Sequence, residues 1–288
     1  MIATKLGEFY RDKDKRWLSI WVAGLLALWI WDLVFLNAPA LARIEAAFVN
    51  TLYAGALVVF MSLVFGWAAG VGLHFLDEAR NRSPYIVLTF FLNVIRSIPQ
   101  IVGILIGYVV ITFFIEQEAL QNQYAQLFWM SFVISLFVFL EVVDLVRDRI
   151  RYFAASDFYP AMLCCGIRES RIVNIEVLWK NSRAHLIHKL IAIFGSAIFL
   201  QCSIDFIISV GLSTDVSSTN FPVTLGSLLA KMDSKQDILA IGSLFGDLSV
   251  FGRLLTEHLQ GVSVAVVIVF SLLCIYQISN GFVKRNSL

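Results

Sequence analysis

The stretch FVNTLYAGALVVFMSLVFGWAAGVGLHFL, residues 48–76, decides the fold class, because it contains no Asp, Glu, Lys or Arg. A helix needs about 20 mainly apolar residues to cross the roughly 30 Å hydrocarbon core of a bilayer. Residues 48–76 exceed that length, and their few polar side chains are all uncharged apart from His74. The stretch therefore predicts a helix that spans a membrane.

Five further apolar runs are long enough for the same purpose. They are residues 17–36, 85–115, 128–146, 186–212 and 262–283. The fifth span in chain order contains His188, Lys189, Gln201 and Asp205, but its centre, LIAIFGSAIFL, is apolar. Hydrophobic residues make up 59% of the chain and charged residues only 15%, a balance that excludes an ordinary soluble domain. The sequence predicts an all-α, polytopic membrane bundle of about six transmembrane helices.

The beginning of the chain does not resemble a cleaved signal peptide. Residues 1–16 are polar, and the apolar run that follows is long and lacks a small-residue cleavage site. We therefore expect residues 17–36 to be a retained first span.

The basic residues predict which ends of the spans face the cytoplasm. Seventeen of the 22 Lys and Arg residues lie in four alternate segments, 1–16, 77–84, 147–189 and 284–288. Only four lie in the intervening segments, 37–47, 116–127 and 213–261. Because cytoplasmic loops carry an excess of Lys and Arg, both termini and residues 147–189 are predicted to be cytoplasmic.

Two pairs of glycines predict where helices pack closely. Gly66-x-x-x-Gly70 and Gly103-x-x-x-Gly107 each place two glycines on one face of a predicted span. Small residues at this spacing let the backbone of a neighbouring helix approach.

The long segment 147–189 has a structure of its own in the sequence pattern. An apolar face at helical spacing is formed by Phe158, Ala161, Met162 and Cys165. Gly166 then predicts the end of this short helix.

A second apolar stripe follows at Ile172, Ile175 and Trp179. The pair of short helices is either a docking knob for a partner or an amphipathic pair that lies in the headgroups. The periodicity alone favours neither.

A family resemblance bears on this choice. Residues 157–178, DFYPAMLCCGIRESRIVNIEVL, resemble the EAA loop of the oligopeptide and dipeptide group of ABC importer permeases. The positions that match the family pattern are Asp157, Phe158, Ala161, Gly166, Ile172 and Leu178. FFLNVIRSIPQIVGILIG, which contains Pro99, and SIDFIISVGL with the later TLGSLLA are similar to other stretches of that group. The likeness covers roughly residues 47–283.

The chain departs from the pattern at several positions of the loop. Pro160 replaces the acidic residue, Met162 the second alanine and Glu176 a histidine, while Trp179 and Lys180 replace a Pro-Asn pair. These departures point to the divergent half of a heterodimer.

The resemblance implies a type I permease fold with three parts. Residues 1–46 would hold the cytoplasmic N-terminus and first span, and 284–288 the cytoplasmic tail. Residues 47–283 would be the permease domain, with the coupling loop at 147–189 and an extracytoplasmic segment at 213–261. The residues expected to couple to the ATPase are Asp157, Phe158, Ala161, Met162, Gly166 and Ile172.

The implied function is the permease subunit of an ATP-driven importer in a bacterial inner (plasma) membrane. It would form the pathway for a small solute, with peptides as the default substrate, by alternating access. The expected partners are a second permease subunit, two ATP-binding subunits, an extracytoplasmic substrate-binding protein and the lipid bilayer, and no nucleic acid. The alternative is a non-transporting structural or regulatory subunit that docks an ATPase.

The chain itself is not expected to be an enzyme. It contains no G-x-x-x-x-G-K-[ST], so ATP would be bound and hydrolysed on the partner, and this chain is expected to bind neither a cofactor nor a metal. It also lacks H-E-x-x-H and G-x-S-x-G.

Charged and amide side chains inside spans are candidates for the transport pathway. Arg96 precedes Pro99 by three residues, and Gln201 and Asp205 lie one turn apart. We expect Arg96, Gln201 and Asp205 to face the interior of the bundle. The alternative for Arg96, as for Asp144, is that the side chain lies at the cytoplasmic interface and snorkels.

Overall fold

The computed structural model describes residues 12–78, 83–211, 221–230 and 260–286. Its helices are α2 (Lys13–Phe35), α3 (Ala38–Glu78), α4 (Ser83–Ser97), α5 (Gln100–Glu116), α6 (Gln123–Val138), α7 (Leu140–Ala154), α8 (Phe158–Cys164), α9 (Glu169–Arg171), the π-helix η1 (Ile172–Asn181), α10 (Arg183–Gly211), α11 (Leu225–Ala230) and α14 (Gln260–Asn286). The described ranges contain no strand, which confirms the predicted all-α class.

Four helices are long and apolar enough to cross a membrane, namely α2, α3, α10 and α14. The number rises to six if each of two bent helix pairs, α4 with α5 and α6 with α7, counts as one span. Many large apolar side chains on these helices are exposed, for example Val34, Val109 and Val269. Such an apolar surface is compatible with a protein that lies in a bilayer.

The third predicted span is not one continuous helix. The run 85–115 is divided into α4 and α5, whose axes are bent by 96° at Ile98 and Pro99. Proline lacks an amide hydrogen and disfavours helical backbone at the preceding residue. The predicted span is therefore broken at Pro99, where α5 begins in a new direction.

The fourth predicted span is longer than residues 128–146 and is also bent. It begins at Gln123, bends by 43° at Phe139 and continues as α7 to Ala154. The Ser135 hydroxyl donates a hydrogen bond to the Phe132 carbonyl one turn before the bend. Serine side chains that bond back to the helix in this way often bend it.

The glycine pairs lie where helices cross, as predicted. A Cβ atom at Gly66 would lie 2.4 Å from Val142 Cβ and 2.9 Å from the Phe139 carbonyl oxygen. Gly70 packs in the same way against Val146 of α7, and both glycines of the second pair pack against α6 side chains. The two spacings therefore mark close contacts between α3 and α7 and between α5 and α6.

This packing leads to a stability prediction. Gly66→Ala is expected to destabilise the protein by about 1–3 kcal/mol, because a methyl group at this position overpacks the contact with α7. Gly72→Ala, on the same helix, is the control, since no atom lies within 4 Å of its Cβ position. It should be neutral or stabilise by up to about 1 kcal/mol. Thermal unfolding in detergent compares the two, and equal melting temperatures would contradict the packing.

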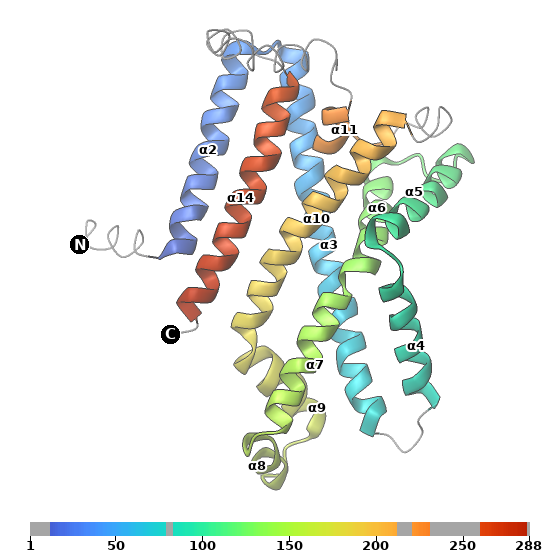
Figure 1. Ribbon diagram of the computed structural model, residues 1–288, viewed down its shortest axis with the longest axis vertical. Helices are drawn as coiled ribbons and strands as arrows, with labels where there is room; N and C mark the ends of the chain where they lie inside the picture. Colours follow the sequence, from blue (N-terminus) through green and yellow to red (C-terminus); the bar gives the residue numbers. More distant parts are fainter. Residues whose placement is uncertain (1–11, 79–82, 212–220, 231–259, 287–288) are drawn as a thin grey trace, which may run out of the picture.

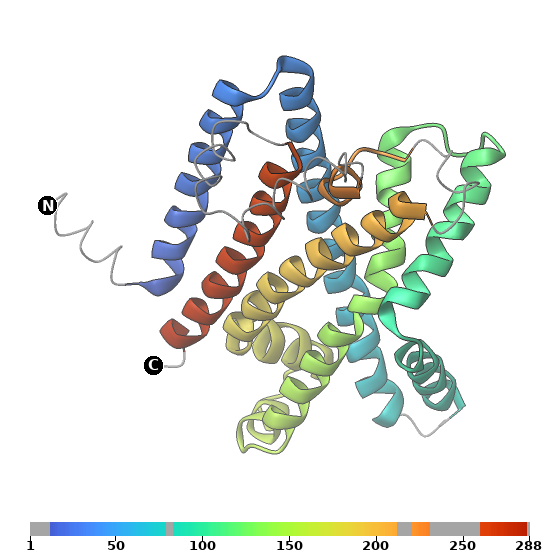
Figure 2. The same ribbon diagram turned by 45° about the horizontal axis from the view of Figure 1, so that its top comes forward.

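The helices form two groups around α3 and α10 (Figure 1). On one side α2 and α14 run side by side, and on the other side lie α4, α5 and α6 (Figures 1 and 2). The first turn of α2 meets the last turn of α14 through an ion pair of 2.6 Å between Asp14 and Arg285. In Figure 1 the start of α2 and the end of α14 are the lower ends of these two helices, and the α8–α9 segment lies at the bottom of the molecule.

Candidate functional site

The short helix α8 ends in a defined glycine turn. Gly166 has a φ of 76°, the left-handed region that favours glycine. Its amide donates to the Leu163 carbonyl at 2.9 Å, and the Ile167 amide donates to the Met162 carbonyl at 3.2 Å. These two bonds form a Schellman motif, and they confirm the predicted helix stop at Gly166.

The chain itself covers part of the predicted apolar face of α8. Tyr159 is the buried residue of the helix, Phe158 and Met162 are half-buried, and Ala161 and Cys165 are exposed. The predicted apolar face is therefore partly covered by the chain at Phe158 and Met162 and is exposed at Ala161 and Cys165. In a helix of seven residues, one side chain with a strong tertiary contact sets the orientation, and here that side chain is Tyr159.

Tyr159 fastens α8 to neighbouring elements through its hydroxyl group. The hydroxyl donates to Glu169 Oε1 of α9 at 2.6 Å and lies 3.5 Å from His74 Nε2 near the end of α3. His74 Nε2 is also 3.4 Å from Glu169 Oε1. The three side chains join α8, α9 and α3 at the lower end of the bundle.

The second predicted stripe, Ile172, Ile175 and Trp179, is wrong at two of three positions. Ile175 and Trp179 are exposed, and the buried residues are Ile172, Val173, Val177 and Leu178. The segment is a π-helix, with bonds from residue i to residue i+5, so its buried positions recur five residues apart. The prediction assumed the α-helical period.

The predicted coupling residues divide into two groups. Asp157, Phe158, Ala161, Met162 and Gly166 lie together on and beside α8, where Asp157, Ala161 and Gly166 are exposed. Ile172 is instead fully buried at the start of η1.

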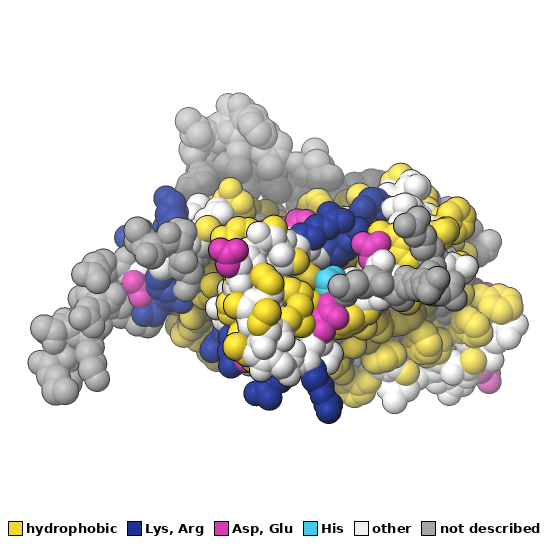
Figure 3. All heavy atoms as spheres, turned by 90° about the horizontal axis from the view of Figure 1, so that it is seen from below, with side chains coloured by type: hydrophobic (Ala, Val, Ile, Leu, Met, Phe, Trp, Pro, Cys, Tyr) yellow, Lys and Arg dark blue, Asp and Glu magenta, His cyan; other side chains and the backbone are white. Residues whose placement is uncertain are grey.

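Exposed basic side chains surround this end of the molecule. Figure 3 views it from below and shows apolar and backbone atoms with Lys and Arg side chains around them. The exposed basic residues of this region are Arg151, Arg168, Arg171, Lys180 and Arg183. The α8 turn is therefore an exposed tip with a basic rim.

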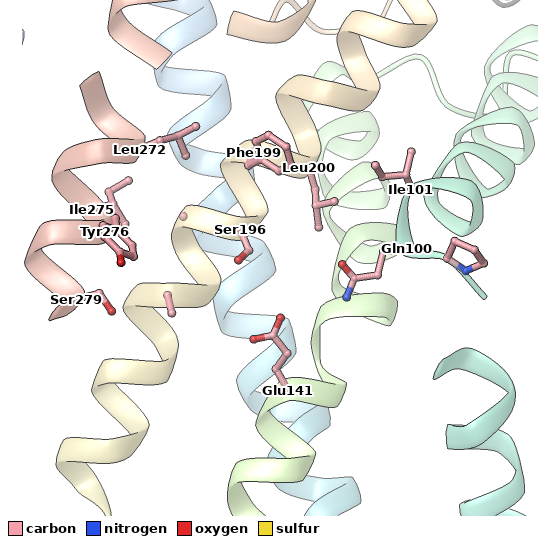
Figure 4. A pocket seen from close by; sticks show the side chains of 13 residues that line it. Gln100, Ile101, Glu141, Ser196, Phe199, Leu200, Leu272, Ile275, Tyr276 and Ser279 are labelled. Carbon is pink, nitrogen blue, oxygen red and sulfur yellow. The ribbon is translucent and has the colours of Figure 1, made fainter. Parts of the chain in front are cut away.

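A cavity of about 700 Å³ lies higher in the bundle, between α7, α10, α14 and the start of α5 (Figure 4). Apolar side chains from these helices form most of its wall, including Ile101, Phe199, Leu272 and Ile275. The polar groups that line it are Gln100, Glu141, Ser196, Tyr276 and Ser279. Its volume falls within the range of about 300–1,000 Å³ that is usual for small-ligand sites.

One ion pair lies at the edge of the cavity. Glu141 Oε2 of α7 is 2.8 Å from Lys189 Nζ of α10, so the pair joins two walls of the cavity. The Ser279 hydroxyl of α14 lies 3.0 Å from His188 Nδ1 of α10. The cavity therefore has an apolar wall with a few polar groups, which is typical of sites that orient a small solute.

None of the three predicted pathway residues lines this cavity. Arg96 forms an ion pair of 2.7 Å with Asp144 of α7, and both side chains are about half exposed. Gln201 and Asp205 are buried on α10. They lie one turn apart, as predicted, but away from Arg96 and from the cavity lining.

The residues that line the cavity were not predicted as a set, and neither was the ion pair at its edge. Glu141 lies near the inner end of its predicted span and Lys189 interrupts another span, but their pairing requires the tertiary arrangement. The only sequence signal for this pair was that Glu141 and Lys189 each place a charge within or beside an apolar run. Opposite charges in two spans are candidates for a pair.

Among the described residues, no group of three or more His, Cys, Asp or Glu side chains is placed to hold a metal ion. No protein-family model matches the sequence, and no curated protein matches it. The function is therefore inferred from the site.

Proposed function

We propose that the chain is the permease subunit of an ATP-driven ABC importer and provides part of the pathway for a small solute. One observation carries the proposal. The exposed helix α8 lies between α7, which precedes it, and η1, which continues into α10. Both α7 and α10 line the cavity. A partner that moves α8 would therefore move two walls of the cavity.

The contact between α7 and η1 supports this coupling. Val146 and Ile150 of α7 belong to the same buried core as Val173 and Val177 of η1. Packed cores transmit displacement because they have few voids and low compressibility. On this proposal α7, α8 and η1 move together when nucleotide binding closes the ATP-binding partners, and the cavity alternates between inward-open and outward-open states.

The moving segment is also bonded to α3. Trp67 Nε1 of α3 donates a hydrogen bond of 2.7 Å to Asn174 Oδ1 of η1. Together with the contact between His74 and Glu169, this bond holds η1 and α9 against α3. Movement of α8 would thus be passed to α3 as well.

The proposed substrate is a small solute with apolar groups, and peptides are the default. The largely apolar wall of the cavity and its polar groups, Gln100, Ser196 and Tyr276, suit such a solute. On this proposal a second permease subunit completes the pathway. The extracytoplasmic segment 213–261, proposed to dock a substrate-binding protein, lies largely outside the described residues.

Purification of the tagged full chain from its native membranes tests the proposal. We expect an ATP-binding subunit with a G-x-x-x-x-G-K-[ST] motif to copurify, together with a second permease subunit. The complex, reconstituted in liposomes, should accumulate solute when ATP is supplied. If an ATP-binding subunit copurifies but the complex does not transport, the chain is instead a non-transporting subunit that docks an ATPase. If no ATP-binding subunit copurifies, both functions are contradicted.

A further inference from the structure

A second polar centre lies in the described part of the bundle, apart from the cavity. It consists of Tyr108 of α5, Gln201 and Asp205 of α10, and Thr224, which precedes α11. All four side chains are buried, with exposed fractions of 1%, 1%, 5% and 0%. Charged side chains are costly inside a membrane and usually mark a functional site there.

The Asp205 carboxylate has no positively charged partner among the described residues. Its Oδ2 atom accepts a hydrogen bond of 2.6 Å from the Thr224 hydroxyl. The Thr224 hydroxyl in turn accepts from the Ser227 amide at 3.2 Å. These neutral groups orient the carboxylate, but they do not compensate its charge.

Three buried polar atoms, on Tyr108 of α5 and on Gln201 one turn before Asp205, form no hydrogen bond. They are the Tyr108 hydroxyl and both polar atoms of the Gln201 amide. The Tyr108 hydroxyl is close enough to interact with the Asp205 carboxylate, although it makes no well-aligned hydrogen bond. Unpaired buried polar groups call for an explanation, and a bound ion or water is one.

The outer side of the centre has a polar approach. A cavity of about 390 Å³ is lined by Gln121, Gln123 and Gln126, with Phe221 also in its wall. The Phe221 ring stacks on Tyr108, with ring centroids 6.1 Å apart. Phe221 thus contacts both the polar cavity and the centre, and its movement would connect them.

We propose that this centre binds one sodium ion. Asp205 supplies the charged ligand, and the Tyr108, Gln201 and Thr224 oxygens supply neutral ones. Hard cations prefer such oxygen ligands, and one carboxylate compensates one positive charge. A sodium ion would also pair the Gln201 Oε1 atom, which a proton on Asp205 would leave unpaired, so the ligand set favours a metal cation. The proposal does not depend on the proposed transport function.

Sodium-dependent stability of the purified full chain in lipid nanodiscs tests the site. Sodium chloride is replaced by N-methylglucamine chloride at constant ionic strength and pH. We expect a saturable rise in melting temperature with sodium, of about 5–10 °C at roughly a hundredfold excess over Kd. Equilibrium binding of radioactive sodium should give one ion per chain.

Variants assign the effect to this centre. Asp205→Asn should abolish the sodium response, whereas Gln201→Met and Tyr108→Phe should each raise the half-saturating sodium concentration by about tenfold. Asp32→Asn is the matched control, because Asp32 is also a buried carboxylate but binds the Ser263 hydroxyl on α14. It should keep the full response.

Three results would overturn the proposal. The melting temperature could be equal in sodium and N-methylglucamine, the sodium response could persist in Asp205→Asn, or the melting temperature could change with pH but not with sodium. If Asp205→Asn does not fold, the half-saturating sodium concentrations of Gln201→Met and Tyr108→Phe decide whether sodium binds at this centre. An unchanged half-saturating concentration in both would then reject the site.

Discussion

A Gly166→Val variant is expected to lose at least about nine-tenths of ATP-driven transport while it remains folded in the membrane. Residues other than glycine pay about 1–2 kcal/mol for the left-handed conformation that Gly166 adopts, and a β-branched side chain pays at least that much. Since no atom lies within 4 Å of the Cβ position, the cost is conformational rather than steric. The turn would rearrange and displace α8 from its partner. Transport into liposomes and copurification of the ATP-binding subunit measure the effect.

Gly166→Asn is the matched control for this variant. Asparagine adopts the left-handed conformation more readily than other residues with a side chain. We therefore expect Gly166→Asn to keep most of the transport and of the association. If the valine variant transports and associates as well as the asparagine variant, the α8 turn does not couple the subunits.

Ser196→Trp is expected to reduce transport to background without loss of the ATP-binding subunit. Ser196 lines the cavity on α10 (Figure 4), and an indole ring there would occupy part of the volume of about 700 Å³. Cavity-filling side chains exclude a ligand without changing a surface that lies elsewhere. The solute that the wild-type complex accumulates is the probe, and uptake per complex is the measurement.

Phe206→Trp on the same helix is the control for Ser196→Trp. Phe206 is exposed and does not line the cavity, so its replacement should leave transport within about twofold of the wild type. Normal uptake by Ser196→Trp would show that the solute crosses the membrane elsewhere.

The helices could be predicted from the sequence because apolar run length is a local property. The runs at 17–36, 48–76, 186–212 and 262–283 correspond to α2, α3, α10 and α14. The bends were harder to predict. Pro99 marks where a helix can break, but hydropathy does not give the size of the bend, which is 96°.

The site could be predicted only where its chemistry is local. The Gly166 turn follows from one residue and its neighbours, and it was predicted correctly. The π-helix over Ile172–Asn181 was not, because its apolar residues also fit an α-helical stripe until tertiary packing selects the five-residue period. The pairs Glu141–Lys189 and Arg96–Asp144 each join helices that are distant in sequence. No local pattern specifies such partners.

Photo-crosslinking from α8 tests most directly whether this helix docks an ATP-binding subunit. A benzophenone side chain is placed at Leu163, which is 44% exposed on α8, or at Val109, which is 58% exposed on α5. After irradiation of native membranes, we expect Leu163 to yield an adduct with a protein that carries G-x-x-x-x-G-K-[ST], and Val109 to yield none. An adduct of Leu163 with lipid alone, or the same ATP-binding protein captured equally from Val109, would contradict the docking of α8.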